Sequence, residues 1–349
     1  MLDSNGGSRS RARGTGLRFV LASGVSSDYQ TVMTQDGCRT DMSDSSLRAY
    51  RMGQLYLLAT AIGWGLNWTV LKFVLHDWPP LFARSTAGLV AALGLVIAAA
   101  SRGEPLWVPR DLFGRLGIAA GINVFAWMGF TALSLNWLKV AEGALIAYSM
   151  PIWATLLAWP LLGDRPGRRS ITALALAVAG ITVLMGGPHL SGGEGKLPGI
   201  LFALAAAILF AWGTVRAHKP IPLPPMILTA WQVGLGCLPM LLISLFWERP
   251  RVGALTLPGL LGMTYMAAGP MALCYLSWFA TLRRLPTSVA ATGMLLVPII
   301  GTLSAALILG EPLGVKELFA FALTLSGVGL ALRRPRTSTS VLAQTSGLS

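Results

Sequence analysis

Charged residues are scarce in this sequence. Asp, Glu, Lys and Arg together make up 12% of its 349 residues, about half their share in an ordinary soluble domain. Hydrophobic residues make up 54%, and the mean hydropathy is +0.64. Several uncharged apolar runs reach the roughly 20 helical residues needed to cross a hydrocarbon core about 30 Å thick. The composition therefore excludes an ordinary water-soluble protein and indicates a membrane protein.

Cysteine and histidine are also rare, with three of each. Cys38 lies in a polar segment, whereas Cys237 and Cys274 lie inside apolar runs without any CxxC or similar ligand spacing. This pattern predicts neither a disulfide framework nor a metal site. The sequence also lacks GxSxG and HExxH motifs, and Gly195-Lys196 lacks the Ser or Thr that would complete a phosphate-binding loop. We therefore expect no cofactor and no enzymatic activity.

The formal net charge of +13 would suggest nucleic-acid binding in a soluble protein. Here the Lys and Arg residues lie mostly in the terminal segments and in short breaks between apolar runs, which is typical of flanks that orient a chain in a membrane. We therefore expect no nucleic-acid partner. Residues 1–50 and 333–349 are polar and are expected to be disordered tails. Because the first apolar run begins directly after Met52, a start of translation at Met42 or Met52 instead of Met1 is a further hypothesis.

The apolar runs predict about ten transmembrane helices in an all-α polytopic membrane protein, because lipid cannot satisfy backbone amides and the runs lack the alternation of barrel strands. We place them at 53–75, 81–100, 112–136, 140–162, 170–187, 198–217, 226–247, 258–282, 287–309 and 313–332. An even number of spans puts both termini on one side, and most loop cations fall on that side. The opposite loops hold only Lys139, Lys196, Arg249, Arg251 and Lys316. The positive-inside rule then predicts that both termini are cytoplasmic.

An internal repeat divides the chain into residues 53–187 and 198–332. At a fixed spacing of 147 residues (298 − 151), Pro151 matches Pro298, and Gly163-Asp164 matches Gly310-Glu311. A weaker match at spacing 148 relates Trp64 to Trp212 (212 − 64). Five spans in each half is an odd number, so the second half enters the membrane from the opposite side. Inverted repeats of this kind place a substrate site near the midplane between the halves.

The matched residues have simple local interpretations. Pro151 and Pro298 lack a backbone N–H and are expected to bend their helices near mid-membrane, either as static kinks or to direct freed carbonyls toward a cavity. The glycines of Gly163-Asp164 and Gly310-Glu311 are expected to end helices in the left-handed conformation. The acid that follows each glycine lies near the N-terminus of the next helix, where a negative charge interacts favourably with the helix dipole. We therefore expect these acids to have a structural role.

Three features resemble the drug/metabolite transporter superfamily of the EamA type. They are the stretch GWGLNWTVLKFVL (63–75), the stretch PPLFARSTAG (79–88) with Arg84, and the two Pro-x11-Gly-[Asp/Glu] helix ends. Asp164 departs from the Glu usual in that motif. The similarity covers about residues 53–332 and implies two copies of a five-helix domain, a central cavity, and export of amino acids, metabolites or drugs.

One face of the first span carries Trp64, Asn67, Trp68, Leu71 and Lys72 at helical spacing. Lipid offers no partner to an amide at mid-helix, so Asn67 should point inward, toward substrate or toward another helix. Lys72, like Arg84 in the second span, is expected near an extracytoplasmic helix end. Both cations either extend to the membrane surface or form a rim that binds a substrate carboxylate or phosphate.

Aromatic residues inside the later spans could build a cavity wall for flat or amphiphilic solutes, or serve packing alone. They are Trp127, Tyr148, Trp153, Trp212, Tyr265, Tyr275 and Trp278. No acid is expected at mid-membrane. Glu142, in the first turn of the fourth span, is the best candidate for a proton carrier, although it could simply pair with Lys139. Facilitated diffusion or exchange is therefore favoured over proton coupling.

These observations predict a transporter of small metabolites in a bacterial cytoplasmic membrane. Export of amino acids or related amphiphilic compounds by alternating access follows from the resemblance, and the expected partners are a small-molecule substrate and the lipid bilayer. A membrane-embedded enzyme would need motifs that the sequence lacks. A receptor or scaffold without transport stays open as an alternative, although a duplicated inverted half has no obvious use there. The sequence does not choose between a monomer and a homodimer.

Overall fold

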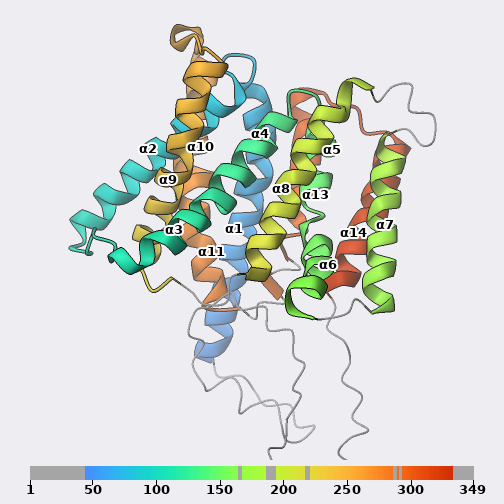
Figure 1. Cartoon of the computed structure of the whole chain (residues 1–349), viewed down its shortest axis with the longest axis horizontal. Coiled ribbons are helices and arrows are strands. Elements are labelled where there is room, and N and C mark those ends of the chain that lie inside the picture. Colours follow the sequence, from blue (N-terminus) through green and yellow to red (C-terminus); the bar gives the residue numbers. More distant parts are fainter. Residues whose placement is uncertain are drawn as a thin grey trace, which may run out of the picture.

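The computed structural model describes residues 44–163, 167–185, 194–216, 221–285, 289–290 and 293–332. Every regular element in these ranges is a helix, and the helices form a single bundle (Figure 1). Each predicted span contains an observed helix. In this part of the chain seven helices are long and apolar enough to cross a membrane, and Ile171–Gly180 and Leu296–Leu309 are shorter apolar helices. The all-helical fold class predicted from the sequence is confirmed.

In the first half, Pro80 starts the second helix, where its missing N–H costs nothing. The elements are α1 (Asp44–Val74), α2 (Pro80–Ser101), η3 (Arg110–Leu112), α3 (Phe113–Ala120), the π-helical η4 (Gly121–Gly129), α4 (Phe130–Ser134), α5 (Val140–Ala147), α6 (Met150–Leu162) and α7 (Arg168–Met185). The segments η3 to α4 form the third span, and α5 with α6 forms the fourth.

In the second half, Pro225 is the first residue of α9 and Pro258 the second residue of α10, again in a first helical turn where the missing N–H costs nothing. The elements are η6 (Glu194–Lys196), α8 (Leu197–Arg216), α9 (Pro225–Trp247), η7 (Val252–Ala254), α10 (Leu257–Ala268), the π-helical η8 (Gly269–Leu273), α11 (Cys274–Leu282), α13 (Leu296–Leu309) and α14 (Val315–Leu332). The segments α10, η8 and α11 form one span.

The duplication is visible in the helical geometry. The π-helical segments begin at Gly121 and Gly269, which lie 148 residues apart (269 − 121), the spacing of the weaker sequence match. Gly163 and Gly310 end α6 and α13 with φ of 79° and 66°, so the predicted left-handed helix ends are confirmed. Asp164 lies outside the described residues.

The two halves interlock. Helix α1 packs against α13 and α11, α2 against α9, and α7 against α14. We call the end of the bundle where α1 begins the proximal end and the end where α1 stops the distal end (Figure 1). Helix α8 begins at the distal end, where Lys196 contacts Glu142 of the first half. The second half therefore runs opposite to the first.

Two boundaries differ from the sequence-based prediction. Helix α1 begins at Asp44, inside the segment expected to be disordered, because Leu47, Arg48 and Ala49 favour a helix and extend it beyond the apolar run. Residues 1–43 and 333–349 lie outside the described residues. In the ninth span, predicted as one helix at 287–309, residues 289–290 and 293 are helical, but a turn at Met294 and Leu295 separates them from α13, which begins at Leu296.

Substituting Gly180 with Ala is expected to lower the free energy of unfolding by about 1–3 kcal/mol, the usual cost of overpacking. A Cβ atom at this buried position in α7 would lie 2.1 Å from Oγ1 of Thr324 and 2.8 Å from the carbonyl oxygen of Ala320 in α14. Thermal unfolding in detergent measures the effect. Gly329→Ala, in α14 with nothing within 4 Å of its Cβ, is the matched control, and equal losses in both variants would contradict the prediction.

Candidate functional site

A charged side chain is buried in the centre of the bundle. Arg84, in the first turns of α2, is 5% exposed, and Asn67 of α1 is 7% exposed. The Nη1 atom of Arg84 donates a hydrogen bond to Oδ1 of Asn67 at 3.3 Å, whereas its Nε atom is buried and has no partner among the described residues. A buried charge is costly unless it is paired. This pair is therefore a candidate binding site.

The neighbours of the Arg84 guanidinium come from both halves of the chain. Tyr148, Cys237 and Tyr275 lie near enough to interact with it electrostatically. Phenol and thiol groups are uncharged near neutral pH at their ordinary pKa values, so these side chains surround the cation without neutralising it. The site therefore carries a net positive charge between the two halves.

Aromatic rings surround this charge in two groups. In the first half, Tyr148 lies 5.9 Å from Trp127 and 6.4 Å from Trp68, between ring centroids. In the second group Trp64 lies 5.4 Å from Tyr275, and its indole N–H donates to the carbonyl oxygen of Pro270 at 3.0 Å. Trp127 and Tyr275 occupy equivalent places in the repeat, 148 residues apart (275 − 127), and the halves contribute matched rings.

The helices break beside this site. Helix α5 ends at Ala147 and α6 begins at Met150, one residue before Pro151, which cannot donate to the carbonyl of Ala147. In the other half α13 begins at Leu296, two residues before Pro298. The two sequence-predicted bend positions thus lie in the first turn of a new helix.

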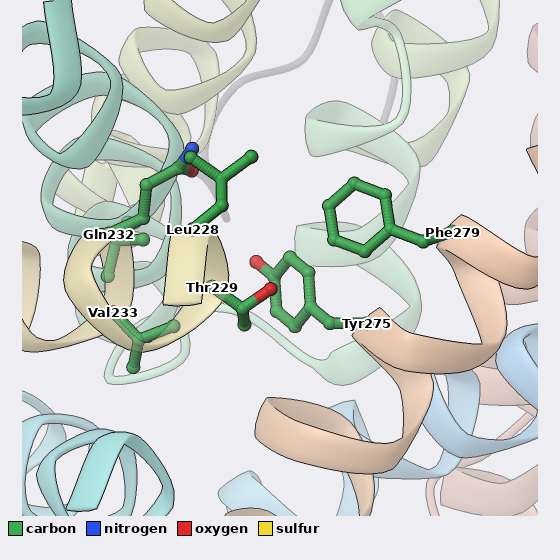
Figure 2. A pocket seen from close by; sticks show the side chains of 7 residues that line it. Leu228, Thr229, Gln232, Val233, Tyr275 and Phe279 are labelled. Atoms are coloured by element: carbon green, nitrogen blue, oxygen red, sulfur yellow. The ribbon is translucent and has the colours of Figure 1, made fainter. Parts of the chain in front are cut away.

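A small pocket leads toward the site from the proximal half of the bundle. Figure 2 shows Tyr275 and Phe279 of α11 on one side of it and residues of the first turns of α9, among them Thr229 and Gln232, on the other. Its volume is about 20 Å³, room for roughly one water molecule. Tyr275 therefore belongs both to the lining of the pocket and to the neighbours of Arg84.

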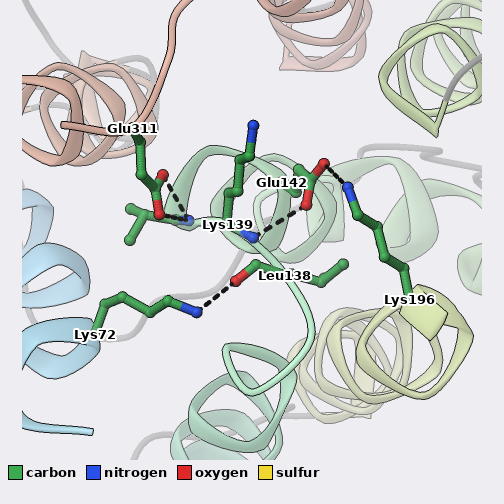
Figure 3. Close-up of polar contacts among 7 residues, drawn as sticks. Lys72, Leu138, Lys139, Glu142, Lys196 and Glu311 are labelled. Atoms are coloured by element: carbon green, nitrogen blue, oxygen red, sulfur yellow. Dashed lines mark hydrogen bonds and ion pairs between the residues drawn. The ribbon is translucent and has the colours of Figure 1, made fainter. Parts of the chain in front are cut away.

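The distal end is closed by polar contacts around the start of α5 (Figure 3). Glu142 is 4% exposed. Its carboxylate accepts hydrogen bonds from the backbone N–H of Lys139 at 3.0 Å and from the Nζ of Lys196 at 2.6 Å. The predicted side-chain pair with Lys139 is therefore wrong: the ion-pair partner is Lys196, because α8 brings it beside α5 in space.

Glu311 connects the second half to the same helix. Both of its carboxylate oxygens accept from the backbone N–H of Val140, at 3.1 and 3.0 Å, so an acid that follows α13 caps the N-terminus of α5. Lys72 donates to the carbonyl oxygens of Leu135 and Leu138. It therefore neither extends to the membrane surface nor forms an open rim, but holds the connection between α4 and α5.

Two further carboxylates join the halves at the distal end. Glu248, after α9, accepts from the backbone N–H groups of Leu81 and Phe82 at the start of α2, both at 3.0 Å. Asp77, after α1, accepts from the N–H and hydroxyl of Thr256 at 2.9 and 2.7 Å, and these bonds lower the pKa of the Asp77 carboxyl. Helix N-termini capped across the halves thus hold this end together.

A known protein family matches this chain twice, once in each half of the fold. The EamA-like transporter family matches residues 51–186 and, a second time, residues 197–333. The chain belongs to the EamA-like transporter family. It is thus an integral membrane transporter with a small-molecule substrate, and its two family domains account for a bundle of about ten helices.

Relatives of this EamA-like chain carry transporter names. A "probable amino-acid metabolite efflux pump" of Salmonella typhimurium is 30% identical over 79% of this chain and 93% of its own. The protein of the same name from Escherichia coli is 27% identical over 79% and 93%, and the uncharacterized transporter YvbV of Bacillus subtilis is 28% identical over 79% and 90%. A crystal structure with a TM-score of 0.56, 20% identical over 86% of this chain and 99% of its own, has the same fold.

Most of the sequence-predicted site residues of this EamA-like transporter lie together. The central group consists of Trp64, Asn67, Trp68, Arg84, Trp127, Tyr148, Tyr275 and Trp278. Lys72 lies instead among the polar contacts at the distal end. Trp212 lies beside Arg216, whose Cζ atom is 5.3 Å from the centroid of the Trp212 ring. Tyr265 lines an apolar groove between α1, α10 and α13. Arg84 lies inside the bundle and does not form an extracytoplasmic rim.

Several contributing residues were not predicted from the sequence. A single cysteine in an apolar run, such as Cys237, does not indicate a binding site in the sequence. The packing of α9 on α2 nevertheless brings Cys237 beside Arg84. In the sequence Lys196 is a loop cation next to an incomplete phosphate-loop motif, and Glu311 is an acid at a helix end, although its place in the repeat could have suggested a contact with the other half. Among the described residues, no group of three or more His, Cys, Asp or Glu could hold a metal ion.

Proposed function

We propose that this transporter exports amino acids or related amphiphilic metabolites by alternating access, with residues 53–187 and 198–332 as the two moving halves. The observation that carries the proposal is the buried, uncompensated guanidinium of Arg84 beside Asn67. A guanidinium binds a carboxylate through two parallel hydrogen bonds, and every amino acid has a carboxylate. The printed names of the Salmonella and Escherichia relatives support the same class of solute.

Alternating access is supported by the difference between the two ends of the bundle. At the distal end, carboxylates of Asp77, Glu248 and Glu311 each accept a hydrogen bond from a helix N-terminus of the other half. The pocket lined by Tyr275, a neighbour of Arg84, lies in the proximal half, where α9 begins and α11 ends. The apolar groove at Tyr265, toward the distal end, is lined by no electrostatic neighbour of Arg84 among the described residues. We infer a conformation that is closed at the distal end and accessible from the proximal end, and we assign the proximal end to the cytoplasm from the distribution of loop cations.

The first test concerns the aromatic wall. Trp64→Ala is expected to lower export about tenfold, because the variant loses a ring contact with Tyr275 and the hydrogen bond to Pro270. A tenfold change corresponds to about 1.4 kcal/mol, within reach of these two interactions. Counterflow of labelled amino acids in proteoliposomes, normalised to the amount of reconstituted protein, measures the effect.

The matched control for that test is Trp247→Ala, at the end of α9, where the side chain is 86% exposed and lies far from the candidate site in sequence. We expect export by this variant to equal that of the wild type. Equal export by wild type and Trp64→Ala would remove this face of α1 from the site. A folded protein that transports no member of a broad metabolite panel would instead favour the scaffold alternative.

A further inference from the structure

Among the described residues, no acidic side chain compensates the charge at the candidate site. Arg84 keeps its proton in a protein interior, and its electrostatic neighbours are two phenols and a thiol. Among the buried residues of the described part of the chain, Glu142 is the only acid. Its carboxylate is already bound to Lys196 and to the backbone of Lys139. A ligand that enters the site therefore has to bring the negative charge.

The Nε atom of Arg84 supplies the second observation. It is buried and has no hydrogen-bond partner in the part of the chain that the structure describes, whereas Nη1 is bound to Asn67. The bond to Asn67 fixes the plane of the guanidinium from one side, so the edge that contains Nε is left for a ligand. A guanidinium edge matches the two oxygens of a carboxylate. Asn67 is thus a positioning residue, and Arg84 is the anchor.

We propose that the site selects carboxylates of net charge −1, such as organic acids and N-acylated amino acids, over zwitterionic amino acids; this rests on the proposed function and narrows its substrate class. A monoanion neutralises Arg84, whereas a zwitterion brings an ammonium group that leaves the net positive charge in place. The groups around the site are the thiol of Cys237 and the rings of Trp68, Tyr148 and Tyr275. Ring faces attract an ammonium, but they do not replace a carboxylate as its partner.

The shape of the surroundings suits an acid with an apolar body. The rings of Trp64 and Tyr275 meet edge to face at 74°, and Trp127 and Tyr148 meet at 82°, an arrangement that offers ring faces to a flat group. Tyr275 lines the proximal pocket and is also a neighbour of Arg84. Because that pocket is small, movement of Tyr275 or of α11 has to accompany entry of the ligand.

The experiment compares three compounds with one phenyl group each and different charges. They are 3-phenylpropanoate (−1), phenylalanine (zwitterion) and 2-phenylethylamine (+1), with N-acetylphenylalanine as a second monoanion. Binding to the purified full chain is measured by ligand-induced thermal stabilisation in detergent. Transport is measured by counterflow in proteoliposomes, with protein-free liposomes subtracted. The same measurements are made on Arg84→Gln.

We expect both monoanions to bind at least tenfold more tightly than phenylalanine, the amine not to bind, and the preference to disappear in Arg84→Gln. Phenylalanine binding as tightly as the monoanions, or more tightly, would overturn the selectivity and leave the exporter function in place. Thermal stabilisation by monoanions that persists unchanged in Arg84→Gln would remove Arg84 as the anchor. Failure of every carboxylate to bind or move, with a folded wild-type protein, would overturn the proposed function itself.

Discussion

Replacing Arg84 with Met is expected to abolish transport and, at the same time, to make the protein more stable. Arg84 is 5% exposed, and the Nε atom of its guanidinium has no partner among the described residues, so the folded protein bears a desolvation cost that a methionine of similar length does not have. Replacing buried charges by well-packed apolar side chains often stabilises a protein by about 1–4 kcal/mol. Arg84→Met should therefore unfold at a higher temperature than the wild type.

The loss of function in this variant should be large. A charge-assisted carboxylate contact contributes about 1.5–3 kcal/mol, and an uncompensated charge in a dry site contributes more, so we expect export to fall by more than about 100-fold. Thermal unfolding in detergent and counterflow in proteoliposomes measure the two effects on the same preparation. Opposite changes in stability and transport are characteristic of a functional site that costs stability.

Arg110→Met is the control for the change of charge, because Arg110 is exposed in η3 at the proximal end. We expect this variant to keep wild-type transport and to gain no stability, since an exposed charge has no desolvation cost to lose. A lower unfolding temperature for Arg84→Met would show that the guanidinium is a structural group, and wild-type export by that variant would remove it from the site.

The fold was predictable because its constraints are local. A run of about 20 apolar residues without charges has few alternatives to a transmembrane helix, and the matched Pro151 and Pro298 identified the two halves. The π-helical segments were not predicted, because one extra residue in a turn leaves no signature in an apolar run such as that around Gly121 or Gly269. Only their matched spacing marks them as inherited features of the repeat.

The site was predictable in its members but not in its geometry. Helical spacing placed Asn67 on the inward face of α1, and the structure adds its bond to Arg84. Lys72 and Arg84 looked alike in the sequence, as cations near helix ends. The structure separates them, because the connection between α4 and α5 offers carbonyl oxygens to Lys72, whereas no such group reaches the Nε atom of Arg84. That difference depends on how the helices pack, and sequence periodicity does not report it.

Removing the Glu311 side chain is expected to open the distal end of the transporter. Glu311 is a second-half residue whose carboxylate holds the N-terminus of α5 in the first half through the N–H of Val140. Helix α5 is eight residues long and ends at the break beside Tyr148. It therefore links the distal contacts to the candidate binding site. Loss of the bond should favour the conformation in which the start of α5 has moved away.

The size of this effect follows from the type of bond. A hydrogen bond to a charged group contributes about 1.5–3 kcal/mol, and every 1.4 kcal/mol changes an equilibrium tenfold. Glu311→Ala should therefore raise the population of the distally open state about 10- to 100-fold. A cysteine at Ala144, which is fully buried in α5, reports that population through its rate of reaction with a membrane-impermeant maleimide. The native cysteines Cys38, Cys237 and Cys274 are first replaced by alanine.

Glu317→Ala is the matched control for Glu311→Ala. Glu317 is also an acid at the distal end, and its carboxylate also accepts from a backbone N–H, that of Gly314, at 2.9 Å. That bond lies within the second half, so its loss leaves the contact between the halves intact. Faster reaction of the cysteine at Ala144 in Glu311→Ala but not in Glu317→Ala identifies the contact between the halves as the gate. Equal rates in the two variants would mean that the distal carboxylates cap helices without controlling access.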